Sequence, residues 1–119
     1  MSKIPSPKNT SELLAPVAEY FKVLSETSRL QILSCLRTGA MNVTEIGEAT
    51  GLGQANLSKH LKVLTQAGLV SRQQKGVSVY YAISDPVIFD LCELVCERIG
   101  NQIQKRAKEF EQIKAFSTL

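Results

Sequence analysis

The fold is decided by residues 51–68, GLGQANLSKHLKVLTQAG. Leu57, Leu61 and Leu64 recur at steps of four and three residues, which places them on one face of a helix. Glycine readily takes the left-handed conformation that ends a helix, so Gly68 marks the end of this one. The glycines at 51 and 53 predict a tight turn before it. The stretch therefore predicts a turn and then an amphipathic helix whose other face is rich in amide and cationic side chains.

A shorter helix precedes this turn. Asn42 is followed three residues later by Glu45, which is the spacing of a capping box at a helix N-terminus. The same helix is expected to end at Gly51. Two short helices joined by a few residues that include glycine form a helix-turn-helix.

Two more helices are predicted upstream. From Thr10, apolar residues recur at three- and four-residue steps and mark one face of a first helix. A second helix is expected from Ser25 as N-cap to Gly39. Residues 1–9 show no periodicity and predict a flexible arm. The apolar residues expected on the first helix are Leu13, Leu14, Val17, Ala18, Phe21 and Leu24, and those expected to be buried on the second are Leu30, Leu33 and Leu36.

After Gly68 the pattern changes from helical to alternating. Residues 69–74 and 78–83 predict two strands joined by a turn at Lys75-Gly76. Pro86 is expected at the first position of a long last helix that ends near Ala115. The predicted fold is mainly α with a small β-hairpin. It is a winged helix-turn-helix of five helices and a two-stranded wing, forming one DNA-binding and dimerisation domain over residues 10–116.

The net charge of +3 is concentrated in one block. No acidic residue lies between Glu48 and Asp85, whereas four basic residues do. The remaining ten of the 14 basic residues stand against all 11 acidic ones, so the rest of the chain sums to −1. A basic surface segment in a nearly neutral chain is typical of a protein that binds a polyanion. The four basic residues are Lys59, Lys62, Arg72 and Lys75.

The side chains in this block have the chemistry for reading double-stranded DNA. In a helix-turn-helix, outward residues at the start of the second helix meet base edges in the major groove. Gln and Asn can pair with adenine, Lys can donate to guanine, and Ala can contact a thymine methyl group. Wing residues are expected to reach phosphates or the minor groove. The predicted DNA-binding residues are Gln54, Ala55, Asn56, Ser58, Lys59, His60, Lys62, Arg72, Gln74, Lys75 and Ser78, with His60 serving either in packing or in a phosphate contact.

Other classes of function have less support. The sequence has no glycine-rich phosphate loop and no nucleophile beside a histidine, so an enzyme is not predicted. A protein-interaction adaptor would have no need for cations on groove-facing positions. No apolar run approaches the ~20 residues of a membrane span, and the first residues lack the apolar stretch of a signal peptide. A cytoplasmic protein without a membrane partner is expected.

Five segments together resemble the ArsR-type family of metal- and redox-responsive repressors. They are RLQIL at 29–33, TEI at 44–46, LSKHLKVL at 57–64, AGLV at 67–70 and VYYAI at 79–83. The resemblance runs from about Phe21 to Pro86. It implies a homodimer, joined through the first and last helices, that occupies an operator and leaves it when an inducer binds.

The inducer is expected to act through cysteine. The resemblance implies two common sensor types, but the last helix lacks the histidines of the zinc type and residues 42–51 lack the cysteine cluster of the best-known arsenic type. Cys92 and Cys96 remain, four residues apart on the last helix. With Cys35 or a second copy of the chain, they could hold a soft ion such as As(III) or Cd(II). They could also act as a redox or persulfide sensor, or simply pack as small apolar residues.

Overall fold

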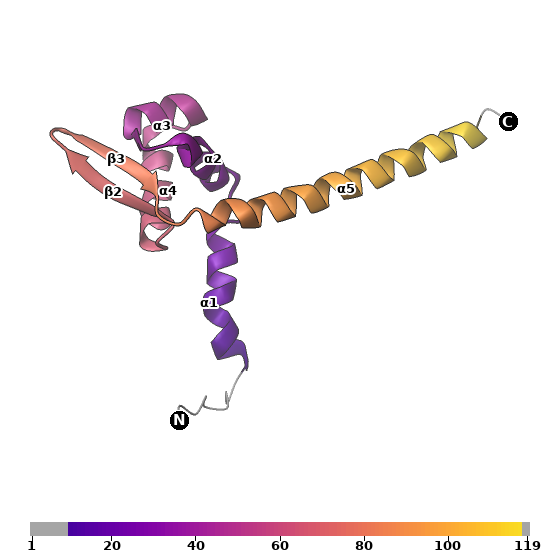
Figure 1. Ribbon diagram of the computed structural model, residues 1–119, viewed down its shortest axis with the longest axis horizontal. Helices are drawn as coiled ribbons and strands as arrows, with labels where there is room; N and C mark the ends of the chain where they lie inside the picture. The colour runs from indigo at the N-terminus through magenta and orange to yellow at the C-terminus, as the bar shows by residue number, and fades with distance from the viewer. Residues whose placement is uncertain (1–9, 118–119) are drawn as a thin grey trace. The chain divides into compact units, whose positions relative to one another are not determined.

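A computed structural model describes residues 10–117, and the chain divides after Asp85 into two compact units. The predicted arm at residues 1–9 lies outside the described residues. The winged helix-turn-helix class is confirmed, with five α-helices and a small antiparallel sheet (Figure 1). The first unit holds α1 (Thr10–Val23), α2 (Thr27–Cys35), the short 3-10 helix η1 (Leu36–Thr38), β1 (Met41–Asn42), α3 (Val43–Thr50), α4 (Gln54–Gln66), β2 (Val70–Lys75) and β3 (Ser78–Ile83), and the second unit holds α5 (Val87–Phe116).

The helix-turn-helix consists of α3 and α4. The predicted capping box is present, because the Glu45 backbone N–H donates to Asn42 Oδ1 at 2.8 Å and the Asn42 backbone N–H donates to Glu45 Oε1 at 3.0 Å. Gly51 ends α3 with a φ of 73°, in the left-handed region that favours glycine. These signals fix where α3 begins and ends, and therefore where the turn before α4 lies.

The core of the first unit lies where α2, α3 and α4 pack together. Leu57, Leu61 and Leu64 on α4 are buried as predicted, and Ile46 on α3 is completely buried. Complete burial of one such side chain contributes about 1.5–3 kcal/mol. The inward face of α4 is thus held firmly against the other two helices.

The second helix differs from its prediction at both ends and on its buried face. Ser25 does not cap it, because its hydroxyl donates to the Lys22 carbonyl at 2.7 Å and the N-cap is Glu26. The α-helix stops at Cys35, and η1 continues the chain to Gly39. Leu33 and Leu36 are buried as predicted, but Leu30 is exposed and Ile32 is buried instead. At about 100° per residue, Ile32, Leu33 and Leu36 fall within an arc of about 100°, and Leu30 lies about 60° outside it.

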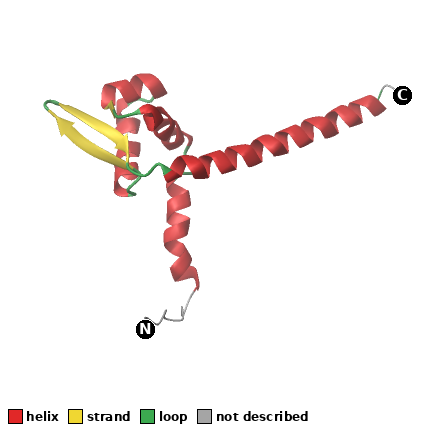
Figure 2. Cartoon of the chain, in the orientation of Figure 1, coloured by secondary structure: helices red, strands yellow, loops and turns green. Residues whose placement is uncertain are grey.

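The sheet has three strands, in the order β1-β3-β2, where only a two-stranded hairpin was predicted. Figure 2 shows the long hairpin of β2 and β3 in yellow. Val70 pairs with Ile83 and Lys75 with Ser78, so the turn is Gly76-Val77, one residue later than expected. The short strand β1 pairs with β3 through Met41↔Tyr81 and Asn42↔Tyr80. Asn42 therefore belongs to the sheet and also caps α3.

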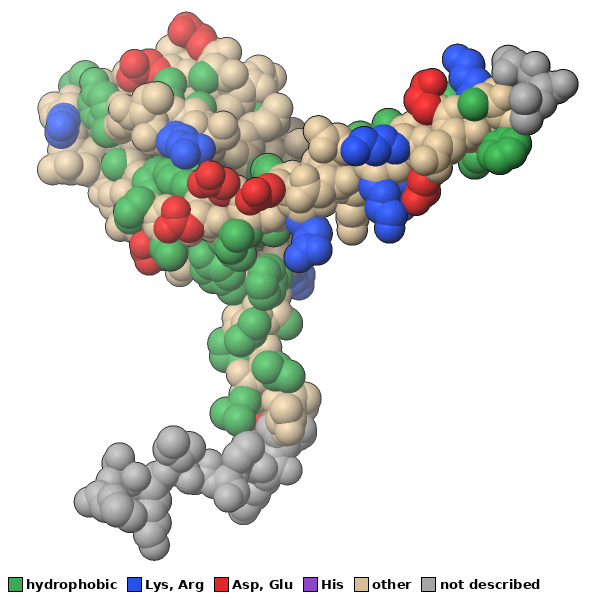
Figure 3. Space-filling model, turned by 45° about the vertical axis from the view of Figure 1, so that its right-hand side comes forward, with side chains coloured by type: hydrophobic (Ala, Val, Ile, Leu, Met, Phe, Trp, Pro, Cys, Tyr) green, Lys and Arg blue, Asp and Glu red, His purple; other side chains and the backbone are tan. Residues whose placement is uncertain are grey.

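The helices α1 and α5 leave much of their apolar surface exposed. Hydrophobic side chains (green in Figure 3) run along α1. The last helix begins at Val87, and Pro86 is its N-cap instead of its first residue. Among residues 10–117, no helix combines the length and apolar character needed to span a bilayer. The large exposed apolar residues are Leu13, Leu14, Val17 and Phe21 on α1, and Val87, Leu94, Val95, Ile99, Ile103, Phe110, Ile113 and Phe116 on α5.

Candidate nucleic-acid interface

The outward face of α4 carries most of the residues predicted to contact bases. Leu57, Leu61 and Leu64 point inward, whereas Ser58, Lys59 and Lys62 on the other side of the helix are exposed. At about 100° per residue, Ser58, Lys59 and Lys62 fall within an arc of roughly 100°. Ala55 lies in the same arc, and Gln54 and Asn56 flank it at the first turn of the helix. The first two turns therefore present amide, hydroxyl and ammonium groups together.

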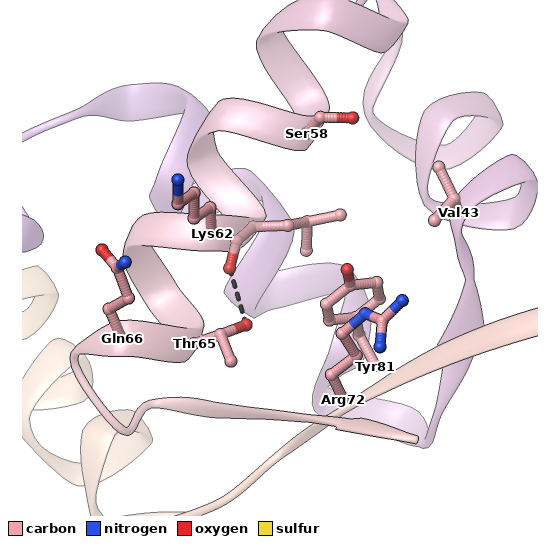
Figure 4. A pocket seen from close by; sticks show the side chains of 8 residues that line it. Val43, Ser58, Lys62, Thr65, Gln66, Arg72 and Tyr81 are labelled. Atoms are coloured by element: carbon pink, nitrogen blue, oxygen red, sulfur yellow. Dashed lines mark hydrogen bonds between the residues drawn. The ribbon is translucent and has the colours of Figure 1, made fainter. Parts of the chain in front are cut away.

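A hollow of about 250 Å³ joins this face to the wing. Figure 4 shows Ser58 and Lys62 extending from α4, and Arg72 and Tyr81 extending from β2 and β3. Arg72 and Tyr81 are cross-strand partners in the sheet. The fold therefore brings together three predicted DNA-binding residues from two elements, two of them cationic. Val43, Leu61, Thr65 and Gln66 complete the lining of the hollow.

Two neighbouring hollows extend the same face. Gln54 lines one of them together with Thr44 of α3, and Ser78 lines the other together with Val77 at the wing turn. Val43 borders all three hollows. The start of α3, the outward side of α4 and the wing thus form one surface, which we call the reading face.

Two wing residues have intramolecular partners. The Lys75 ammonium group lies 5.5 Å from the centre of the Tyr80 ring, within the range of a cation–π contact. The side-chain amide of Gln74 donates to the Gly76 carbonyl at 3.3 Å. These contacts orient both side chains at the tip of the hairpin. Lys75 and Gln74 remain exposed to solvent there.

His60 is placed differently from the other predicted residues. It lies on the inward side of α4, is only 8% exposed, and accepts a hydrogen bond at Nδ1 from Arg29 Nε at 3.2 Å. At about 100° per residue it is roughly 160° from Lys62. This placement favours packing, one of the two roles predicted for His60, over contact with phosphate.

Sequence reasoning missed several residues of the reading face. Val43, Thr44, Thr65, Gln66 and Tyr81 line its hollows but were not among the predicted contacts. Tyr81 stands opposite Arg72 across the strands, but the turn expected at Lys75-Gly76 gave another register and so did not point to it. Val43 and Thr44 could not be predicted, since their position depends on how α3 packs beside the wing.

The three cysteines are divided between the two units. Cys35 is half-buried on α2, and its thiol donates to the Ile32 carbonyl with 3.1 Å between Sγ and O. Burial raises its pKa, and this effect outweighs the bond with the backbone. Cys92 is half-buried on α5 and Cys96 is exposed. Burial raises the pKa of Cys92, and the negative charge that Cys96 can carry raises it further. Both Cys35 and Cys92 are therefore mostly protonated thiols at neutral pH.

The donors for a metal are incomplete within one chain. Among residues 10–117, no three His, Cys, Asp or Glu side chains lie close enough together to hold a metal ion. Cys92 and Cys96 supply two sulfur donors one helical turn apart. A soft ion that requires three ligands would need another donor from outside this pair.

Comparisons with known proteins agree on one family. Residues 26–72 match a family model described as "Bacterial regulatory protein, arsR family". NmtR, a transcriptional regulator of Mycobacterium tuberculosis, is 37% identical over 89 residues, which are 75% of this chain and 74% of that protein. The arsenical resistance operon repressor of Bacillus subtilis is 38% identical over 92 residues, 72% of this chain and 85% of that protein.

One solved structure extends the likeness to three dimensions. It is the solution structure of the homodimeric winged helix-turn-helix DNA-binding domain of Mb0332 from Mycobacterium bovis, described as a possible ArsR-family transcriptional regulator. It superposes with a TM-score of 0.71 at 30% identity, covering 86% of this chain and 94% of that one.

Proposed function

We propose, on the premise that this chain belongs to the ArsR family of bacterial regulatory proteins and is a DNA-binding transcriptional repressor, that its reading face docks on an operator with α4 in the major groove. The observation that carries this docking mode is that Lys62 of α4 and Arg72 of β2 line one hollow between the helix and the wing. Cationic side chains from two elements on one face favour contact with the DNA backbone.

Base reading is assigned to the first two turns of α4. Gln54 and Asn56 carry amides that pair with adenine, and Lys59 carries an ammonium that donates to guanine. Ala55 offers a methyl group to thymine. Ser58, Lys62 and Arg72 contact the DNA backbone and thereby position the protein on it. Gln74, Lys75 and Ser78 contact the DNA backbone from the wing.

The active form in this proposal is a homodimer through α1 and α5. Both helices expose apolar side chains in a single copy, which is unfavourable in water. The related Mb0332 domain is described as homodimeric. A second copy would make residues 10–116 one DNA-binding and dimerisation domain. It would also place two reading faces on half-sites one DNA turn, about 34–36 Å, apart.

The inducer site in this proposal is the Cys92–Cys96 pair. A soft ion such as As(III) or Cd(II) would be held by both thiolates, with a further ligand from Cys35 or a second copy. The relative from Bacillus subtilis is named as a repressor of arsenical resistance. Binding would release protons from the thiols, since the thiolate is the ligand.

A second candidate is thiol redox sensing, and it is favoured by the incomplete donor set. Two thiols are enough for this chemistry. One hydrogen peroxide molecule would accept two electrons and two protons from the two thiols and become two water molecules. An S–S bond would form between the two sulfur atoms. A persulfide donor would transfer its outer sulfur to one thiolate instead.

Salt dependence of operator binding tests the DNA-docking mode. A footprint upstream of the chain's own gene supplies the operator. Operator affinity should fall steeply with salt, and Lys62→Ala, which removes a proposed phosphate contact, should reduce the slope of log affinity against log salt by about one. Lys105→Ala on α5 is the matched control and should leave the slope unchanged. Retention of DNA that is independent of salt would contradict the proposal.

The inducer is identified by operator binding with and without As(III), Cd(II), Zn(II), peroxide or a persulfide donor. Cys92→Ser should keep operator binding and lose release by the active inducer, and Cys96→Ser should behave similarly. Cys35→Ser shows whether the third thiol takes part. If both α5 variants still release normally, these cysteines are packing residues.

A further inference from the structure

Tyr80 lies on the middle strand of the sheet. It is paired with Gln73 of β2 on one side and with Asn42 of β1 on the other. Because β3 lies between the other two strands, the backbone at this residue is held from both edges. The Tyr80 side chain is half-buried. Its ring is therefore attached to a firmly held part of the wing.

The face of this ring holds the cation of Lys75. Lys75 Nζ lies 5.5 Å from the ring centre. Lys75 is two residues beyond Gln73, the cross-strand partner of Tyr80, so the two side chains are diagonal neighbours on one face of the hairpin. Lys75 itself is exposed and is the last residue of β2 before the turn. The contact thus restrains a long side chain that otherwise samples many rotamers.

An aromatic ring restrains this cation without neutralising its charge. No acidic residue lies between Glu48 and Asp85, so neither strand of the hairpin offers a carboxylate to Lys75. A carboxylate partner would cancel the charge that attracts a phosphate, whereas a ring attracts the cation through its quadrupole and carries no net charge. An ammonium group also has three N–H donors for other partners. Lys75 is therefore held in place and still available to an anion.

Lys75 lies on the opposite face of the hairpin from Arg72. Successive residues of a strand point to opposite faces, and these two are three residues apart. Arg72 and its cross-strand partner Tyr81 extend into the hollow beside α4 (Figure 4). The two strands of the wing therefore carry one cation on each face.

We propose that Tyr80 is a positioning residue, which holds Lys75 ready to contact a DNA phosphate on the side of the wing away from α4. The inference rests on the proposed function, since the ligand is the backbone of the operator. A free side chain loses rotamer freedom when it binds, and this loss lowers affinity. Because the ring has already restrained Lys75, less freedom is lost on binding. Tyr80 thus contributes to affinity without contacting DNA.

The experiment is a double-mutant cycle on the operator affinity of the full chain, at fixed salt and pH. Tyr80→Leu removes the ring and should weaken binding about threefold at each wing, or about tenfold for a dimer. In a Lys75→Ala background, the same substitution should change affinity by less than about twofold, because no cation remains to be positioned. In a Lys105→Ala background, which removes an exposed cation from α5, Tyr80→Leu should cause its full loss.

Two further readouts on DNA separate positioning from a purely structural role. Tyr80→Phe keeps the ring and should recover most of the affinity that Tyr80→Leu loses. Lys75→Ala should reduce the salt dependence of binding, whereas Tyr80→Leu should leave it unchanged because the cation is still present. Circular dichroism confirms that each variant is folded before affinities are compared.

A measurement without DNA tests the contact itself. Protons that lie over an aromatic ring have shifted NMR resonances, so the side-chain protons of Lys75 should show a ring-current shift in the wild type. The shift should persist in Tyr80→Phe and disappear in Tyr80→Leu. Its absence from the wild type would overturn the inference.

The outcomes on DNA separate this inference from the proposed function. Absence of operator binding by the wild type would contradict the proposed function, and this inference with it. Normal binding by the wild type, with the same loss from Tyr80→Leu whether or not Lys75 is present, would overturn this inference alone. Failure of Tyr80→Phe to recover affinity would do the same, since the ring face would then not be what matters.

Discussion

The helices α4 and α5 use their apolar residues in opposite ways. On α4, the three leucines and His60 are turned into the core of the first unit, and the polar side chains face outward. On α5, Leu94, Val95, Ile99 and Ile103 are all between about half and two thirds exposed. A helix that leaves such a surface in water normally has a partner for it. The comparison indicates that the reading face is complete in one chain, whereas α5 requires another surface.

The largest expected effect is on the core beneath α4. Leu61→Ala removes a side chain that is 1% exposed, and the cavity should lower the free energy of unfolding by about 3 kcal/mol. Urea unfolding measures this change. The control is Val77→Ala at the fully exposed wing turn, which should change stability by less than about 0.5 kcal/mol. Equal losses in both variants would mean that α4 is not packed as described.

The next effect concerns the exposed face of α5. Ile99→Glu should leave the helix content intact but prevent association, lowering operator affinity by about 100-fold because both half-sites are no longer held together. Sedimentation velocity and operator titration measure the two effects. Gln104→Glu places the same charge on the opposite side of α5 and should leave both unchanged. An Ile99→Glu protein that still sediments as a dimer would contradict the inference that the exposed face of α5 requires a second surface.

A smaller effect is expected where α3 begins. Asn42→Ala removes the side chain that accepts from the Glu45 N–H, and it should cost about 1 kcal/mol of unfolding free energy. Thermal or urea unfolding measures it. Asn101→Ala on α5 removes an amide that caps no helix and should not destabilise the fold. A neutral Asn42→Ala would show that the capping box contributes nothing.

The smallest effect is on the acidity of the α5 thiols. The pKa of Cys92 is raised mainly by burial and further by Cys96. Cys96→Ser should therefore lower the pKa of Cys92 part of the way toward its ordinary value, and alkylation of Cys92 should begin at a lower pH. Peptide mass spectrometry after alkylation at several pH values resolves each cysteine. An unchanged midpoint would mean that the two thiols do not interact.

Local signals were sufficient to predict most of the fold. The capping box at Asn42 and the glycines at 51 and 68 act within a few residues of themselves, so the sequence alone places α3 and the end of α4. The exposed side of α4 followed from the spacing of its leucines. The same reasoning placed Ser58, Lys62 and Arg72 at one site, because a hairpin directly follows the helix.

What could not be predicted depends on contacts between distant residues. Arg29 and His60 are 31 residues apart in the sequence, and no local pattern around either residue predicts their hydrogen bond. β1 is only two residues long, too short for an alternating pattern, and exists because β3 pairs with it. Leu30 is exposed although it was expected to be buried, and Ile32 is buried, because burial depends on how α2 packs against α3 and α4, which the pattern of a single helix does not reveal.

The double membership of Asn42, in β1 and in the cap of α3, has a mechanical consequence. A bend of the hairpin about its base would pull on the β1–β3 pairing and therefore on the first turn of α3. The wing and the helix-turn-helix should thus open together as one cooperative unit in native-state hydrogen exchange. An operator would then bind to a preorganised surface, and the wing would not need to become ordered on binding.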